Sequence, residues 1–299
     1  MSVLSTLLYH SIFDYPLNIE ELHHYLISDK QVSVKALKKE IENLLKAKKI
    51  SQWNDFFLPS TLSPQPLALV SLRLRRQKIS AKKLTIARRA AKTISIIPWI
   101  KMVAVTGALA MENTDENDDI DLMVVTSKNR LWIVRPLATI LVSIFFKRRR
   151  HSNSVFSIQN SELKNAVCLN LWLDKSALAI PVDQRNLYTA HELAQMKPVV
   201  NKDGTYEKMM WGNRWGMKYL ANAWERFEGW QVNRLKRSNN FHAFDLFSLL
   251  NFLAFNLQFQ FMKSKMTNER VSIHSAFFHP VNRTDTILSE YDRLCHRNF

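Results

Sequence analysis

The stretch that decides the fold is VTGALAMENTDENDDIDLMVV, residues 105–125. The β-branched run at residues 101–106 predicts one buried strand, and residues 120–126 predict a second. Asp119 and Asp121 are two residues apart, so on a strand their carboxylates point to the same face. Two neighbouring carboxylates repel each other unless a cation lies between them. The stretch therefore predicts a cation site where the second strand begins.

Gly107 follows the first of these strands, at an expected turn into a short helix. A glycine lets the backbone approach a phosphate closely, and the N–H groups at the start of a helix bind it. A phosphate-binding turn opposite paired carboxylates is the minimum that Mg²⁺-assisted phosphoryl or nucleotidyl transfer requires. A solvated turn would explain Asp115 and Glu116, but it does not explain two aspartates in an apolar strand.

These motifs have the order and spacing of a known signature. Residues 106–108 read Thr-Gly-Ala, and after a spacer residues 119–121 read Asp-Ile-Asp. The segment resembles the nucleotidyltransferase superfamily of the DNA polymerase β type, whose signature is a hydrophobic residue, Gly, Ser or Gly, a spacer, and Asp-hydrophobic-Asp. The resemblance covers residues 101–126 directly and extends loosely to a third expected strand at 166–173. It implies an α/β (α+β) nucleotidyltransferase-like core.

The resemblance also implies roles for individual residues. Asp119 and Asp121 would hold Mg²⁺ (or Mn²⁺), and Gly107 and Ala108 would contact the phosphates of an NTP. Arg130, which follows the second strand, has the length to reach a triphosphate, although the surface of a helix is an equally good place for it.

Two residues depart from the family pattern. Ala108 stands where the family has Ser or Gly, so a backbone N–H remains but a hydroxyl contact is lost. The family takes a third carboxylate from a later strand, and here the mid-strand residue is Asn170, which can bind a metal ion but cannot act as a base. Asp174, four residues further on, is the alternative for that third catalytic position.

The chain has 299 residues and a formal net charge of +16, and 46% of its residues are hydrophobic. Two cysteines exclude a disulfide framework, and the N-terminal sequence lacks the pattern of a signal peptide, so we expect a cytoplasmic protein. The apolar stretches Val134–Phe146 and Leu246–Met262 are too short or too interrupted for stable membrane insertion. Attachment to a membrane surface through their basic flanks is the alternative, and the oligomeric state is left open.

Three parts are expected along the chain. Residues 1–60 predict three short helices and a hairpin, the pattern of a winged helix-turn-helix domain that contacts either nucleic acid or protein. Residues 61–200 would form the nucleotidyltransferase-like core behind a leading basic helix. Residues 201–299 predict an all-helical C-terminal region, with long helices at 205–237 and 244–265. A Pro- and Ser-containing stretch at 59–66 marks the first boundary.

The leading helix, expected at residues 67–97, concentrates positive charge. Residues 56–111 contain ten basic side chains and no acidic one. Such a run is either a solvated face or a binding surface for nucleic-acid phosphates. The candidate phosphate contacts share one helix face: Arg75, Lys78, Lys82 and Arg89.

Together these features predict an Mg²⁺-dependent enzyme that transfers a nucleoside monophosphate from an NTP to a hydroxyl. The net charge favours a nucleic-acid acceptor such as an RNA end over a protein or a small molecule. The alternative is a non-catalytic nucleic-acid-binding or regulatory protein whose degenerate core senses nucleotides, and Asn170 is the residue that favours it.

Overall fold

The N-terminal elements lie where the sequence predicts them. The computed structural model describes residues 2–61, 66–148, 164–227, 246–264, 266, 269–278 and 283–298, so residues 62–65 of the predicted boundary lie outside it. Three helices precede an antiparallel hairpin: α1 (Ser2–Ser11), α2 (Ile19–His24), α3 (Val34–Lys46), β1 (Ile50–Trp53) and β2 (Phe56–Pro59). Asn18 and Glu21 form a reciprocal capping box that fixes the start of α2. The winged-helix assignment stays a prediction.

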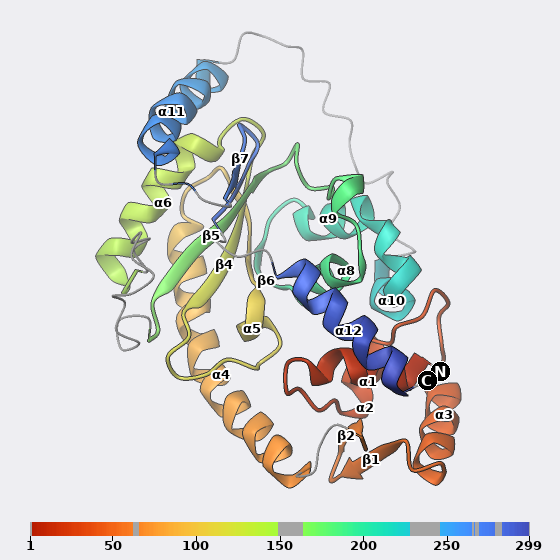
Figure 1. Ribbon diagram of the computed structural model, residues 1–299. Coiled ribbons are helices and arrows are strands. Elements are labelled where there is room, and N and C mark those ends of the chain that lie inside the picture. The colour runs from red at the N-terminus through yellow and green to blue at the C-terminus, as the bar shows by residue number, and fades with distance from the viewer. Residues whose placement is uncertain are drawn as a thin grey trace.

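A mixed sheet of six strands forms the centre of the molecule (Figure 1). Its order is β6 (Lys197–Asn201), β3 (Ile100–Val105), β4 (Ile120–Thr126), β5 (Val167–Asp174), β8 (Ser275–Phe277) and β7 (Arg270–Val271). Only β4 and β5 pair in parallel, and the other neighbours are antiparallel. The mixed α/β class and the three central strands confirm the prediction, whereas β6, β7 and β8 were not predicted. The prediction that residues 201–299 are all helical is wrong, because β7 and β8 of this region complete the sheet.

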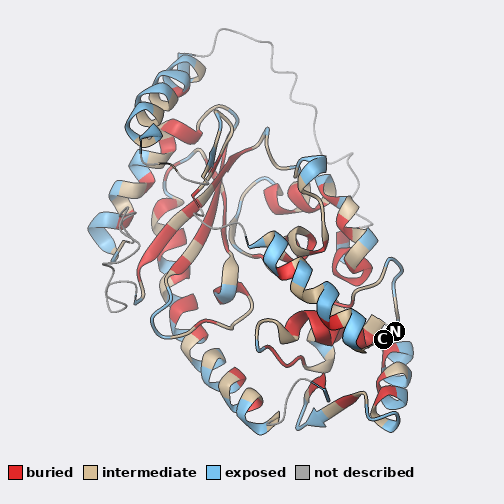
Figure 2. Ribbon diagram, viewed as in Figure 1, coloured by how far each residue is buried: buried red, intermediate tan, exposed pale blue. Residues whose placement is uncertain are grey.

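Helices cover both faces of this sheet (Figures 1 and 2). The described helices after β2 are α4 (Pro66–Ile94), α5 (Gly107–Ala110), α6 (Leu131–Phe145), α8 (Leu187–Gln195), α9 (Thr205–Gly212), α10 (Met217–Trp224), α11 (Leu246–Lys263) and α12 (Thr284–Asn298). Of these, α12 packs on α1 and α8. On one face, Val103, Val124 and Trp172 share a core with α4 and α6. On the other face, Met123 and Val125 share a core with α8 to α10 and with the N-terminal helices. The N-terminal elements therefore pack directly onto the sheet.

The prediction of one long helix at residues 205–237 is wrong for residues 205–227. Residues 228–237 lie outside the described part of the chain. The chain forms α9 and α10, with short 3₁₀ helices at Arg214–Gly216 and Glu225–Phe227; a further 3₁₀ helix lies at Val182–Gln184. The break falls at Asn213, whose buried amide donates to the carbonyl of Leu178 and accepts from the N–H of Ile180. An asparagine that bonds to backbone in this way competes with the helix.

Candidate functional site

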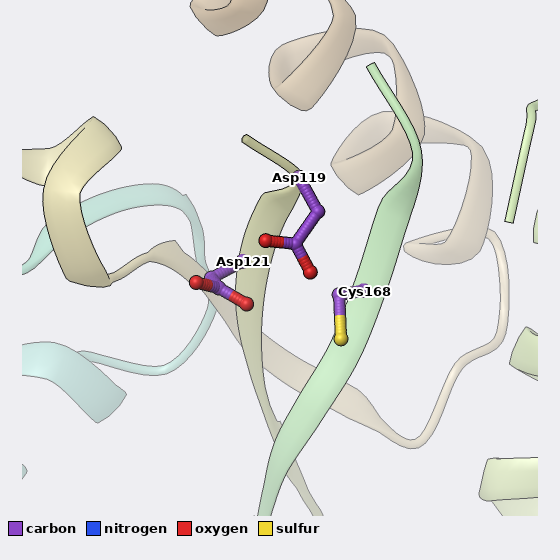
Figure 3. A group of neighbouring side chains, drawn as sticks. All are labelled: Asp119, Asp121 and Cys168. Atoms are coloured by element: carbon purple, nitrogen blue, oxygen red, sulfur yellow. The ribbon is translucent and has the colours of Figure 1, made fainter. Parts of the chain in front are cut away.

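The two aspartates of the motif lie side by side at the start of β4. Asp119 directly precedes the strand and Asp121 is its second residue, and both are half-buried. In the parallel register Cys168 of β5 is the partner of Asp121, which places its thiol on the same face of the sheet. One ligand atom from each residue lies within 4.8 Å of the other two (Figure 3). The structure thus brings the predicted pair together and places beside it the thiol of Cys168, a buried residue of β5.

The turn at Gly107 lies directly against this pair. Gly107 has φ +62°, a left-handed conformation that favours glycine, and a Cβ added there would be 3.0 Å from Oδ2 of Asp121. The N–H of Thr106 donates to the backbone carbonyl of Asp121 at 3.2 Å, which joins the turn to the strand. Ala108, the next residue of the turn, is exposed. The glycine is therefore required both by backbone conformation and by the space that the carboxylate occupies.

Asn170 also lies at Asp121. The register between β4 and β5 shifts at this residue, because Leu122 pairs with Leu169 and Met123 with Leu171. A bulge of this kind re-aims a side chain. The buried amide of Asn170 donates from Nδ2 to Oδ1 of Asp121, while its own Oδ1 has no hydrogen-bond partner among the described residues. The structure thus brings Asn170 into contact with the aspartate pair.

Asp174 does not lie at the pair, so the structure removes it as the alternative to Asn170. It is paired with Thr126 at the far end of β4, about 17 Å along the strand from Asp121 at about 3.3 Å per residue. Its buried carboxylate accepts from the N–H groups of Asn129 and Ser176 and contacts Nδ1 of His274 at 2.8 Å. Asp174 therefore holds the loops at that end of the sheet. The sequence spacing could not predict this separation, because it depends on β4 and β5 being parallel.

Arg130 lies at the same far end, and the structure does not bring it to the aspartates. It directly precedes α6, donates to the carbonyl of Asn129 at 2.8 Å and stacks over the ring of Phe247 at 5.0 Å. These contacts hold the side chain against α11. Of the two interpretations considered for Arg130, the structure favours the one that places it at a helix surface.

Basic side chains on the inner face of α4 hold the acidic loop that leads into β4. The buried Lys83 donates from Nζ to the carbonyls of Asp115 and Asp118, at 2.6 and 2.5 Å, and burial lowers its pKa. Arg76 pairs with the carboxylate of Asp115 at 2.9 Å. The sequence analysis had grouped such residues with the exposed basic face, but their charges are used inside the molecule. The loop that carries Asp119 is therefore fixed from the α4 side.

The four predicted phosphate contacts remain on the outer face of α4. All are exposed: Arg75, Lys78, Lys82 and Arg89. The helix is continuous from Pro66 to Ile94. At 1.5 Å per residue the four side chains span about 21 Å of one face. We call these four side chains the basic stripe.

No protein-family model, curated protein or solved structure matches this chain.

Proposed function

We propose that the chain is an Mg²⁺-dependent nucleotidyltransferase that moves a nucleoside monophosphate from an NTP to a hydroxyl, with release of pyrophosphate. The observation that carries the proposal is the close approach of the Gly107 turn to the carboxylate of Asp121, which lies beside Asp119. A phosphate bound at this turn would lie next to two carboxylates that can hold a cation.

The two carboxylates fit a hard divalent cation, whereas the neighbouring thiol of Cys168 is not a ligand that Mg²⁺ prefers, so the carboxylates would hold the ion. Asp119 and Asp121 supply the oxygen ligands that Mg²⁺ and Mn²⁺ prefer, and a Cβ at residue 107 would intrude on one of them. The Oδ1 atom of Asn170, buried and without a partner among the described residues, is a further oxygen beside Asp121. When bound, the cation would neutralise charge on the phosphate oxygens and orient the group that is transferred.

The chain's own residues would provide position and electrostatics. Lys83 and Arg76 hold the loop in front of Asp119, so the carboxylate does not have to be ordered when substrate binds. Asn170 cannot accept a proton, so the proton of the attacking hydroxyl would pass to water. We therefore expect turnover about 10²–10⁴-fold below that of a site with a general base.

The acceptor class follows from charge. The net charge of +16 and the basic stripe favour a polyanion, and an RNA end combines phosphates with a free hydroxyl. The affinity should fall steeply with salt. Reversal of Arg75, Lys78 and Lys82 should reduce the salt slope by about one for each lost contact. Lys218→Glu, an exposed lysine on α10, is the matched control.

The experiment that tests the proposal is transfer from each labelled NTP to a single-stranded RNA in the presence of Mg²⁺ or Mn²⁺. Asp121→Asn should abolish transfer while the fold remains intact. Glu116→Gln, an exposed acid in the same loop, should leave transfer unchanged. Full activity in a folded Asp121→Asn protein would refute the metal assignment.

A second function is favoured by one contact. The amide of Asn170 donates to Oδ1 of Asp121. This contact orients the carboxylate of Asp121 although the site has no third acidic residue. A core that binds nucleotide but does not transfer it would keep this contact. Calorimetry that detects NTP binding lost in Asp119→Ala, combined with no turnover on any RNA, would favour nucleotide sensing over catalysis.

A further inference from the structure

Helix α11 exposes many large apolar side chains to solvent, while three of its polar side chains bond to the protein. Asn251 is buried and accepts from the N–H of Trp132 at 2.8 Å, and Gln258 donates to the carbonyl of Trp132 at 2.7 Å. Ser248 accepts from the amide of Asn129 at 3.1 Å. The helix is therefore fixed to the N-terminal half of α6 by hydrogen bonds on its inner side. Ala254, Phe255 and Met262 also pack inward, but the many leucines left exposed are unusual for a surface helix of a globular protein.

The outward face of α11 is mostly apolar, with Asn256 and Gln260 as its exposed polar residues. Its apolar side chains follow helical spacing and are at least 40% exposed: Leu246, Leu249, Leu250, Leu253, Leu257 and Phe261. Helix α6, which lies beside α11 at one edge of the molecule (Figures 1 and 2), exposes a second set: Leu137, Ile140, Ile144 and Phe145. We call the two sets together the apolar surface. Large exposed apolar surfaces of this kind mark sites of protein or membrane contact.

The described charges within α6 and α11 and directly at their ends are positive. The sequences of α6 and α11 contain no acidic residue, and residues 122–161 contain seven bases and no acid. Lys147 follows the end of α6, and Lys263 is the last residue of α11; both are exposed. Lys128, exposed, and Arg130, stacked on Phe247, lie at the other end of the helix pair. Apolar rows flanked by cations are typical of helices that lie in the interface of an anionic bilayer.

We propose that the apolar surface docks on an anionic lipid bilayer, with α6 and α11 lying in the plane of the interface. Among the described residues no helix is long and apolar enough to cross a membrane. The proposed contact is with the surface of the bilayer. A second copy is the weaker candidate, because each chain brings a net charge of +16 and the flanks of the surface would meet like charges. The proposal is independent of nucleotidyl transfer.

Vesicle binding tests the proposal with the full-length chain. The protein should float with vesicles that contain phosphatidylglycerol and bind at least tenfold more weakly to pure phosphatidylcholine. The double substitution Leu253→Asn and Leu257→Asn should weaken binding at least tenfold, because two leucines no longer enter the bilayer. Ile96→Asn is the matched control, since Ile96 is 70% exposed but lies outside the apolar surface.

The cations are tested separately. Lys147→Glu combined with Lys263→Glu should lower affinity for the anionic vesicles by about fivefold per lost cation and leave binding to neutral vesicles unchanged. Lys35→Glu with Lys38→Glu, exposed on α3, is the control pair. Circular dichroism would establish that each variant is folded.

Three results would overturn the proposal. The first is no flotation of the folded wild-type chain with anionic vesicles. The second is flotation that the leucine variant and the Ile96 variant reduce equally. The third is a dimer in light scattering that Leu253→Asn dissociates, since a second copy would then cover the surface.

Discussion

Replacement of Gly107 by alanine tests the contact on which the proposed site depends. An alanine at φ +62° is strained by about 1–2 kcal/mol, the cost of the left-handed conformation for a residue with a Cβ. The new Cβ would also lie 3.0 Å from Oδ2 of Asp121, so the carboxylate must shift by a few tenths of an ångström. We therefore expect both a loss of stability and a weaker hold on a divalent cation.

A second glycine supplies the control. At Gly212 a Cβ would meet only the Cβ of Ala179, at 4.0 Å, and the backbone is not left-handed. Gly212→Ala should be neutral or stabilise the fold by about 0.4–1 kcal/mol. Urea unfolding would measure both variants, and Mn²⁺ titration by calorimetry would measure the cation affinity. Equal unfolding midpoints and equal affinities for the two variants would refute the reasoning.

Three further predictions follow from single contacts. Lys83→Met removes the two hydrogen bonds from the ammonium group of Lys83 to the carbonyls of Asp115 and Asp118 and should cost about 1–3 kcal/mol in urea unfolding, whereas the exposed neighbour Lys82→Met should cost nothing measurable. Asn170→Asp should destabilise the metal-free fold through repulsion with Asp121 and tighten Mn²⁺ binding; unchanged affinity would show that residue 170 does not reach the cation. Burial lowers the pKa of His10 from 6.5 to about 3. Between these two pH values the unfolded chain binds one more proton than the folded chain, so the stability falls as the pH falls. His10→Gln should reduce the slope of stability against pH in this range by about 1.4 kcal/mol per pH unit, and an unchanged slope would contradict this.

Local pattern predicted the central strands well. Residues 120–126 are β-branched and apolar around one carboxylate, and β4 has these bounds in the structure. The spacing of Asp119 and Asp121 was enough to place both carboxylates on one face, because strand alternation is a property of the backbone. The edge strands β7 and β8 have two and three residues and carry too little pattern to be read from sequence.

Long-range register could not be predicted. The partnership of Asp121 with Cys168 and the distance of Asp174 both depend on β4 and β5 being parallel, which no local pattern encodes. The break at Asn213 has the same origin, because its amide bonds to Leu178 and Ile180 in a separate segment. These contacts are non-local, and tertiary contacts override helix propensity.

The paired carboxylates do not by themselves require a cation. The amide of Asn170 donates to Asp121, and the ammonium group of Lys83 lies close enough to Asp119 to interact with its charge, so the folded chain offsets part of the repulsion. A cation that binds only the folded state adds about 2.7 kcal/mol of stability at a concentration of one hundred times its Kd. The wild-type chain should therefore gain stability with Mn²⁺, while Asp121→Asn should be at least as stable without the metal and gain nothing from it. A metal-dependent gain that persists in Asp121→Asn would place the cation elsewhere in the molecule.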